Sequence, residues 1–256
     1  MPRPSLDPSL NSAEFMGVRF APLTMKKTVS VIENALVEKK RLQHVVINVA
    51  KLVNLRSDAS LRKDVMESDL VNVDGMGVVW GARLCGVDVP ERVSGIDLMH
   101  QVLKLCMEKG YRCYFLGAKE EVLATAIRNI ETDYPGIPIA GSRNGYFDES
   151  EEDGIVSAIR DAKTDCLFIA ISSPKKERII HQYRDAFGAS FLMGVGGSID
   201  VVAGYVTRAP LWMQKSGLEW LYRVIQEPGR MWKRYLITNS KFLFLLIGEL
   251  FRRKND

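Results

Sequence analysis

The fold is decided by the stretch Leu70-Val71-Asn72-Val73-Asp74-Gly75-Met76-Gly77, in which an apolar run long enough for a buried strand ends on an acid and a glycine turn. In an open sheet of parallel strands, ligands bind beyond the carboxyl ends of the strands, so Asp74 stands where chemistry is expected. The alternative is that Asp74 only caps the next helix, because Asp is a favoured N-cap residue and Asp-Gly is a common turn.

Helical and extended patterns alternate on both sides of this stretch, which is typical of a parallel sheet covered by helices on both faces. Ser94 and Asp97 are spaced as a capping box for one of the helices. The pattern predicts a Rossmann-like α/β/α sandwich of about six mostly parallel strands, followed by a helical, basic C-terminal appendage. The helices are expected over residues 25–40, 58–67, 78–84, 94–109, 120–132, 151–162 and 175–187, and the strands over 45–49, 70–73, 111–116, 137–140, 166–171 and 191–195.

Composition and length describe one globular chain of 256 residues, with 46% hydrophobic and 26% charged residues. Its four cysteines form no C-x-x-C pair and its three histidines no cluster at zinc-ligand spacing, so we expect reduced core thiols in a cytoplasmic protein. Residues 1–15 are assigned to a disordered leader or cloning remnant, 16–205 to an α/β catalytic domain, and 206–256 to the appendage. No apolar run approaches about 18 residues and no signal peptide is apparent, so we expect no membrane-spanning helix.

The basic residues are concentrated in the appendage, which carries ten Lys and Arg against four Asp and Glu in a chain of net charge +4. Aromatic residues lie among these cations, and Phe242-Leu243-Phe244-Leu245-Leu246-Ile247 is followed by Arg252-Arg253-Lys254. A helix with apolar residues on one face and cations on the other can lie in the headgroup region of an anionic membrane. The alternative is an amphipathic helix that packs on the domain or on a partner subunit.

Three further strand ends are candidates for a phosphate site, because small or hydroxyl residues there precede a helix. They are Leu116-Gly117-Ala118-Lys119-Glu120, Gly194-Val195-Gly196-Gly197-Ser198, and Ile171-Ser172-Ser173-Pro174-Lys175-Lys176-Glu177. The alternatives are steric glycine turns and an ordinary helix start with exposed lysines. The sequence contains no P-loop, no G-x-S-x-G, no H-E-x-x-H and no D-x-D pair, so a diphosphate would be bound by Arg, Lys and backbone N–H groups rather than by a metal clamp.

Many of these residues belong to ordered motifs over residues 16–235 that resemble those of the WecG/TagA/CpsF glycosyltransferases. The motifs are, in chain order, Asn48; Asp74-Gly75-Met76-Gly77; Arg92-Val93-Ser94-Gly95-Ile96-Asp97-Leu98; Phe115-Leu116-Gly117; Ser173-Pro174-Lys175-Lys176-Glu177; Gly194-Val195-Gly196 with Asp200, Ala203 and Gly204; Arg208-Ala209-Pro210; and Gly217-Leu218-Glu219-Trp220-Leu221-Tyr222-Arg223 with Glu227-Pro228 and Arg230.

The resemblance implies a bacterial, metal-independent, inverting enzyme that needs no cofactor. It would move a sugar from a UDP-sugar to a polyprenyl-diphosphate-linked saccharide, at the inner face of the cell membrane, in cell-surface or exopolysaccharide biosynthesis. It implies that Asp74 is the general base, that Asn48 positions the donor sugar or the acceptor, and that Arg92 lies beside the active site. For Arg92 the alternative is a structural ion pair.

Further site residues are assigned with the resemblance in view. We assign donor or phosphate binding to Gly75, Gly77, Gly117, Ser173, Lys176, Glu177, Gly194, Gly196 and Asp200. We assign acceptor or diphosphate binding to Arg208, Arg223 and Arg230, and no residue to a metal site.

Three departures from the family pattern bear on the sugar. Val46 stands where a hydroxyl residue is usual, and Ser172 and Lys176 replace the glycine and glutamine of a G-x-P-x-Q-E motif. Many members transfer N-acetylmannosamine, but these changes leave a glucose-type or other hexosyl donor open.

Rival functions make different demands on the sequence. A dehydrogenase would need the glycine fingerprint that is absent here. A nucleic-acid binder would need a recognised motif, which the cations among bulky aliphatic residues do not form. A non-catalytic nucleotide-binding membrane adaptor stays open, as does a homo-oligomer.

Overall fold

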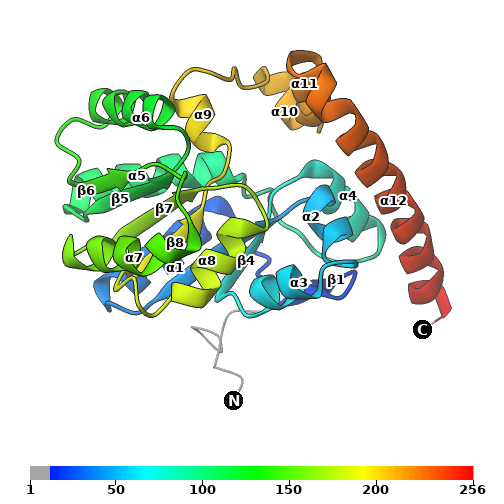
Figure 1. Cartoon of the computed structure of the whole chain (residues 1–256). Helices are drawn as coiled ribbons and strands as arrows, with labels where there is room; N and C mark the ends of the chain where they lie inside the picture. The colour runs from blue at the N-terminus through cyan, green and yellow to red at the C-terminus, as the bar shows by residue number, and fades with distance from the viewer. Residues whose placement is uncertain (1–11, 256) are drawn as a thin grey trace.

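A sheet of six parallel strands forms the middle layer of the computed structural model, which describes residues 12–255 (Figure 1). The strand order is β4-β3-β8-β7-β5-β6, and every neighbouring pair is parallel, as the alternation of helices and strands predicts. The strands are β3 (Leu42–Ile47), β4 (Leu70–Val73), β5 (Cys113–Gly117), β6 (Ile139–Arg143), β7 (Cys166–Ala170) and β8 (Phe191–Gly194).

Helices cover both faces of the sheet because successive strand residues point to opposite faces. Phe115 and Phe168 pack into one hydrophobic cluster, whereas their neighbours Leu116 and Leu167 pack into another. The first face carries α1 (Met25–Val37), α5 (Gly95–Lys109), α6 (Glu120–Asp133) and α9 (Ser198–Val202). The second carries α2 (Val49–Asn54), α3 (Ala59–Met66), α4 (Met76–Leu84), α7 (Glu152–Asp161), which the 3-10 turn η1 (Glu149–Glu151) precedes, and α8 (Lys175–Tyr183). The predicted α/β/α sandwich is confirmed.

An N-terminal hairpin was not expected from the sequence. Strands β1 (Ala13–Phe15) and β2 (Val18–Phe20) pair antiparallel around Met16 and Gly17, which both have positive φ, as the tight turns that match strand twist require. Phe15 is completely buried. The hairpin therefore includes the last three residues of the stretch assigned to a leader, and residues 1–11 lie outside the described residues.

Helix α2 is a second unexpected element. We expected residues 45–49 to form a strand, but the strand ends at Ile47 and a helix begins at Val49. Asn48 separates the two elements as the N-cap of α2, where its side-chain oxygen accepts a hydrogen bond from the Lys51 N–H. One polar residue after a strand is thus enough to start a helix.

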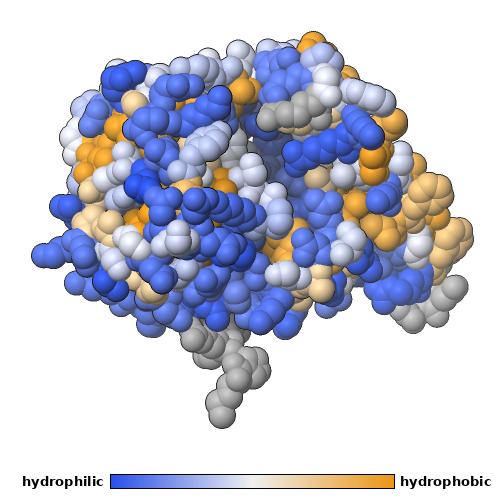
Figure 2. Space-filling view, viewed as in Figure 1, coloured by the Kyte–Doolittle hydropathy of each residue, from blue (hydrophilic) through white to orange (hydrophobic). Residues whose placement is uncertain are grey.

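The C-terminal segment forms α10 (Leu211–Lys215), α11 (Glu219–Gln226) and the long helix α12 (Pro228–Asn255), which runs down one edge of the domain (Figure 1). One side of α12 is packed on the domain, because Phe242 and Leu246 are buried and a β-carbon on Gly81 of α4 would lie 3.1 Å and 3.3 Å from them. The other side exposes large apolar residues, and Figure 2 shows orange side chains gathered along this edge. None of the helices in the described range is both long and apolar enough to cross a bilayer.

Candidate active site

The residues that follow four neighbouring strands gather at one edge of the sheet. Asp74 follows β4, Asn48 follows β3, Gly194 ends β8 and Ser172 follows β7 by two residues. Because all four strands are parallel and adjacent, their carboxyl ends meet. Figure 2 shows the surface hollowed between the sheet domain and α11, with hydrophilic residues around the hollow. This edge is the candidate site.

Asp74 is held by the start of helix α5 rather than used as a cap of the helix that follows it. The N-cap of α4 is Gly75, whereas Asp74 Oδ2 accepts a hydrogen bond of 3.1 Å from the Gly95 N–H. Burial raises the pKa of Asp74; the Arg92 charge and the Gly95 hydrogen bond lower it in part, and the charges of Glu219 and Asp97 raise it further. A carboxylate with a raised pKa is a stronger base, which suits proton abstraction.

A network of carboxylates and guanidinium groups surrounds Asp74. Arg92 Nη1 donates to Glu219 Oε2 at 3.0 Å, and Arg208 donates to both Asp97 oxygens at 2.5 and 2.8 Å. Arg208 Nε also lies 3.7 Å from Glu219 Oε1. The ion pair considered for Arg92 therefore exists, and it ties α11 to the edge of the sheet beside Asp74.

The structural partner of Asp97 differs from the predicted one. Ser94 is the N-cap of α5, but its side chain makes no capping hydrogen bond, so the predicted capping box is wrong. Burial alone would raise the pKa of Asp97, but the hydrogen bonds and charge of Arg208 lower it overall, with help from Ser94 and Arg92. Asp97 therefore holds Arg208 next to the site.

The turns after β3 and β4 approach each other closely. A β-carbon on Gly75 would lie 3.4 Å from Asn48 Cβ, and one on Gly77 only 2.9 Å from Val49 Cγ2. Asn48 itself caps α2, so its side-chain oxygen is occupied by a backbone N–H. Packing of α2 against α4 accounts for the two glycines, and Asn48 lies beside the loop that carries Asp74.

A second charged cluster lies where β3, β7 and β8 end. Lys51 Nζ is 2.7 Å from Glu177 Oε1 in a buried ion pair, and Lys176 Nζ is 3.6 Å from the same oxygen. Burial lowers the pKa of Lys176, and the charge of Lys51 lowers it further. For Glu177, burial would raise the pKa, but the two lysines lower it overall. Two cations share one carboxylate, so the cluster carries a net positive charge.

Lys176 lies directly over the glycine turn that follows β8. A β-carbon on Gly194 would be 3.0 Å from Lys176 Cδ and Cε, and one on Gly196 would be 3.3 Å from its Nζ. Lys176, Gly194 and Gly196 were each assigned to phosphate binding. They therefore form one surface, where a cation lies beside glycine backbone that has no side chain to cover it.

Arg223 reaches the same turn from the appendage. A β-carbon on Gly197 would lie 3.9 Å from Arg223 Nη1 and 3.5 Å from Asp200 Oδ2. Helix α11 thus brings a cation from sequence position 223 to the turn after β8. Such a guanidinium can make paired hydrogen bonds to phosphate oxygens.

The remaining assigned residues are Gly117, which lies apart from the site, Ser173, which joins the second charged cluster, and Arg230. Gly117 ends β5, two strands from β8, and has a φ of +131°; a β-carbon there would be 2.4 Å from the Ala170 carbonyl, so close backbone packing requires the glycine. Ser173 is exposed before α8, and its side chain hydrogen-bonds Glu177 of the second charged cluster. Arg230 lies at the start of α12, and its side chain is outside the described residues.

Sequence reasoning missed two residues of the site. Glu219 was quoted only within a motif, although it pairs with both Arg92 and Arg208. Lys51 gave a weak signal as a single cation among apolar residues in Val49–Asn54. Within residues 12–255, no group of three or more His, Cys, Asp and Glu is arranged to hold a metal ion.

The chain is similar in sequence to known proteins. The chain matches the sequence model of the glycosyl transferase WecG/TagA/CpsF family over residues 13–256. It is 38% identical over 187 residues to the N-acetylglucosaminyldiphosphoundecaprenol N-acetyl-beta-D-mannosaminyltransferase of Bacillus subtilis strain 168, across 73% of this chain and 72% of the relative. It is 37% identical over 169 residues to the protein of the same name from Bacillus spizizenii strain W23, across 66% of this chain and 65% of the relative.

Proposed function

Since the chain belongs to the WecG/TagA/CpsF family of glycosyl transferases, we propose that it transfers a hexosyl group from a UDP-sugar to a polyprenyl-diphosphate-linked saccharide in bacterial cell-surface or exopolysaccharide biosynthesis. The two Bacillus relatives support this acceptor class, because their name describes a diphosphoundecaprenol-linked sugar as acceptor. The donor sugar proposed is of the N-acetylmannosamine or glucose type.

The proposed transfer reaction rests on the position of Asp74. Its carboxylate lies at the carboxyl edge of the sheet, fixed by the Gly95 N–H, and has a raised pKa. In the proposed reaction it takes the proton from an acceptor hydroxyl as that oxygen bonds to the anomeric carbon. The bond from this carbon to the phosphate oxygen breaks, and UDP leaves with the electron pair. One displacement from the opposite face inverts the anomeric centre and needs no enzyme nucleophile.

The cations around the turn after β8 support a role in binding the diphosphate. Lys176 lies over Gly194 and Gly196, and Arg223 lies beside Gly197. These groups can neutralise the negative charge that develops on the leaving phosphate, so the proposed mechanism uses no metal ion or other cofactor.

The exposed side of α12 supports the proposed membrane location. Phe244 is 79% exposed, Leu243 is also exposed, and Lys233, Arg234 and Lys241 are exposed on the same helix. Apolar residues beside cations suit the headgroup region of an anionic bilayer. We therefore propose that the enzyme acts in the cytoplasm, on the inner face of the cell membrane. The double substitution Leu243→Ser and Phe244→Ser should lower binding to phosphatidylglycerol vesicles, whereas unchanged binding would contradict this location.

The catalytic proposal is tested by incubating the protein with a panel of UDP-sugars and a short-chain lipid diphosphate saccharide, then determining the mass of the product. Asp74→Asn should keep UDP binding and the urea midpoint but lower transfer by about 10²- to 10⁴-fold, the usual contribution of a general base. Asp88→Asn, which changes an exposed carboxylate just beyond α4, is the matched control.

Two results would contradict the proposal. Near wild-type turnover of Asp74→Asn would show that Asp74 is not the base. UDP binding without transfer of any sugar in the panel would instead favour a non-catalytic nucleotide-binding membrane adaptor.

A further inference from the structure

The turn that joins α10 to α11 lies directly on the indole ring of Trp80, a residue of α4. A β-carbon on Gly217, in this turn, would lie 2.6 Å from Trp80 Cη2 and 2.9 Å from Met76 Cβ. Both distances are shorter than β-carbon contacts in proteins, so the backbone of the turn touches the ring and only glycine fits there. This contact between Trp80 and Gly217 is called the Trp80 seat below.

Local structure already accounts for one requirement for glycine at position 217. Helix α10 ends in a Schellman motif, in which the Leu218 N–H donates to the Met213 carbonyl at 2.8 Å. The Gly217 N–H donates to the Gln214 carbonyl at 3.3 Å, and Gly217 has a φ of +66°. The Trp80 seat is a second, independent requirement, because even a residue that tolerates this φ would push its β-carbon into the ring.

The indole of Trp80 is not a core side chain. Trp80 is 46% exposed, whereas Val78, Val79 and Ala82 form the buried face of α4. The two ring atoms nearest to Gly217 are Cη2 and Cζ3, at the tip of the indole. A large ring that is half open to water and meets a distant segment with its tip is suited to docking that segment.

Helix α11 is not held in place by buried side chains of its own, since none of residues 219–226 is buried. Its first residue, Glu219, accepts from Arg92 at 3.0 Å and lies 3.7 Å from Arg208 Nε. Ion pairs that are partly open to water contribute little on their own. Packing of the preceding turn on Trp80 therefore fixes the point from which α11 starts.

Helix α4 relates α11 to the candidate base. It begins at Met76, two residues after Asp74, and Trp80 lies about one turn further on. Helix α11 begins at Glu219, just after the seated turn, and Arg223 follows four residues later on the same face. One rigid helix thus carries the Asp74 turn at its start and, a turn later, the seat for the helix that brings Glu219 and Arg223.

We propose that Trp80 is a positioning residue of the candidate active site, which holds Glu219 against Arg92, and Arg223 beside the turn after β8, by seating the turn at Gly217. The inference rests on the proposed function, because Glu219 and Arg223 serve Asp74 and the diphosphate in that reaction. Trp80 acts through the placement of α11 and not on the substrate.

The test measures amide hydrogen exchange of residues 219–226 by mass spectrometry, which reports local opening of α11 whether or not the protein transfers a sugar. Trp80→Ala removes the ring from beneath the turn. Exchange of α11 should then become at least about tenfold faster, because the packing that holds its start is lost.

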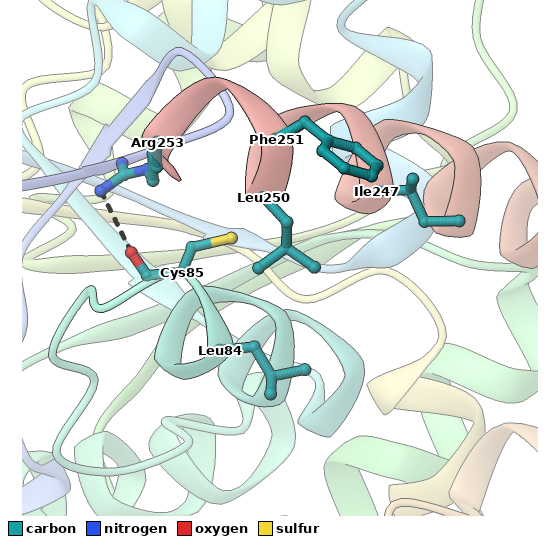
Figure 3. Close-up of a pocket in the computed structure, with 6 residues that line it drawn as sticks. All are labelled: Leu84, Cys85, Ile247, Leu250, Phe251 and Arg253. Carbon is teal, nitrogen blue, oxygen red and sulfur yellow. Dashed lines mark hydrogen bonds between the residues drawn. The ribbon is translucent and has the colours of Figure 1, made fainter. Parts of the chain in front are cut away.

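The matched control is Leu84→Ala, which removes a large apolar side chain one turn further along α4. Leu84 is 67% exposed and lines an apolar groove between α4 and the last turns of α12. Figure 3 shows it opposite Leu250 of α12. The control loosens the other end of the C-terminal segment, so exchange of α11 should stay within about twofold of the wild type.

Transfer kinetics test whether the seat acts on the site through Glu219. Burial is the main cause of the raised pKa of Asp74, and the charge of Glu219 raises it further. Release of α11 in Trp80→Ala should therefore move the acid limb of the kcat/KM profile to lower pH, as Glu219→Gln should. In the double variant the limb should lie where Glu219→Gln alone places it, because both changes withdraw the same charge.

Unchanged exchange of α11 in Trp80→Ala, or an equal increase in Leu84→Ala, would overturn the proposal. So would shifts of the acid limb that add in the double variant, because Trp80 would then not act through Glu219. A wild type that transfers no sugar would contradict the proposed function, while the exchange of α11 still decides whether Trp80 holds this helix.

Discussion

Acidification should destabilise the protein through His44, which lies on β3 in the interior. Its Nε2 is 3.0 Å from Asn72 Oδ1, and Asn72 Nδ2 donates to Thr28 Oγ1 at 3.4 Å. The Asn72 oxygen can only accept, so Nε2 carries the proton of the neutral ring. Nδ1 is buried without a hydrogen-bond partner. A second proton on Nδ1 would therefore place an uncompensated charge in the core.

The size of the effect follows from the pKa. Burial lowers the pKa of His44 from 6.5 to about 4; the Asn72 hydrogen bond opposes this in part, and the Lys51 charge adds to it. The unfolded chain binds the proton below about pH 6.5 and the folded chain only near pH 4, so stability falls as the pH drops between these values. At ~1.36 kcal/mol per pKa unit, the loss from neutral pH to about pH 5 is about 2 kcal/mol.

The assay is urea unfolding at about pH 7.5 and about pH 5 for the wild type and for His44→Gln, whose amide can donate to Asn72 but does not titrate. Carboxylates and His100 titrate in both proteins, so the difference between the two free energies of unfolding isolates His44. The wild type should lose about 2 kcal/mol more than the variant on acidification. Parallel losses, within about 0.5 kcal/mol, would refute the assignment of a neutral buried His44.

Two further predictions concern the candidate site and the sheet that supports it. Glu219→Gln removes a negative charge that raises the pKa of Asp74, so the acid limb of the kcat/KM profile should move to lower pH; an unmoved limb would show that Asp74 does not set it. Gly117→Ala should cost at least about 3 kcal/mol in urea unfolding, because its β-carbon would overlap Ala170 in a strained backbone. The matched control is Gly110→Ala, which also has positive φ but open space, and should cost only about 1 kcal/mol. Equal losses would remove the steric explanation of Gly117.

The sheet, and the position of Asp74 at its edge, could be predicted from local patterns. Leu70, Val71 and Val73 are apolar because β4 is buried on both faces, and the helices between strands require parallel pairing. The ordered motifs indicated the family independently. The N-terminal hairpin and α2 were missed because both are short: the strands of the hairpin have three residues each and α2 has six, too few to show a periodic pattern.

The side-chain partners could not be predicted, because they join residues far apart in sequence. Arg92 meets Glu219 and Lys51 meets Glu177 only after the appendage and the strand ends have come together. No periodicity in the chain encodes such pairs, since their geometry depends on how α2, α8 and α11 pack.

The sequence by itself determined that an acid follows a buried parallel strand, and with it the fold class and family, because these depend on local periodicity and on ordered motifs. Only the tertiary structure decided that Asp74 is held by α5 instead of capping α4, and that α4 and α12 enclose an apolar groove. The physical reason is that burial, charge and shape at a site are properties of the packed chain, to which segments more than a hundred residues apart contribute together.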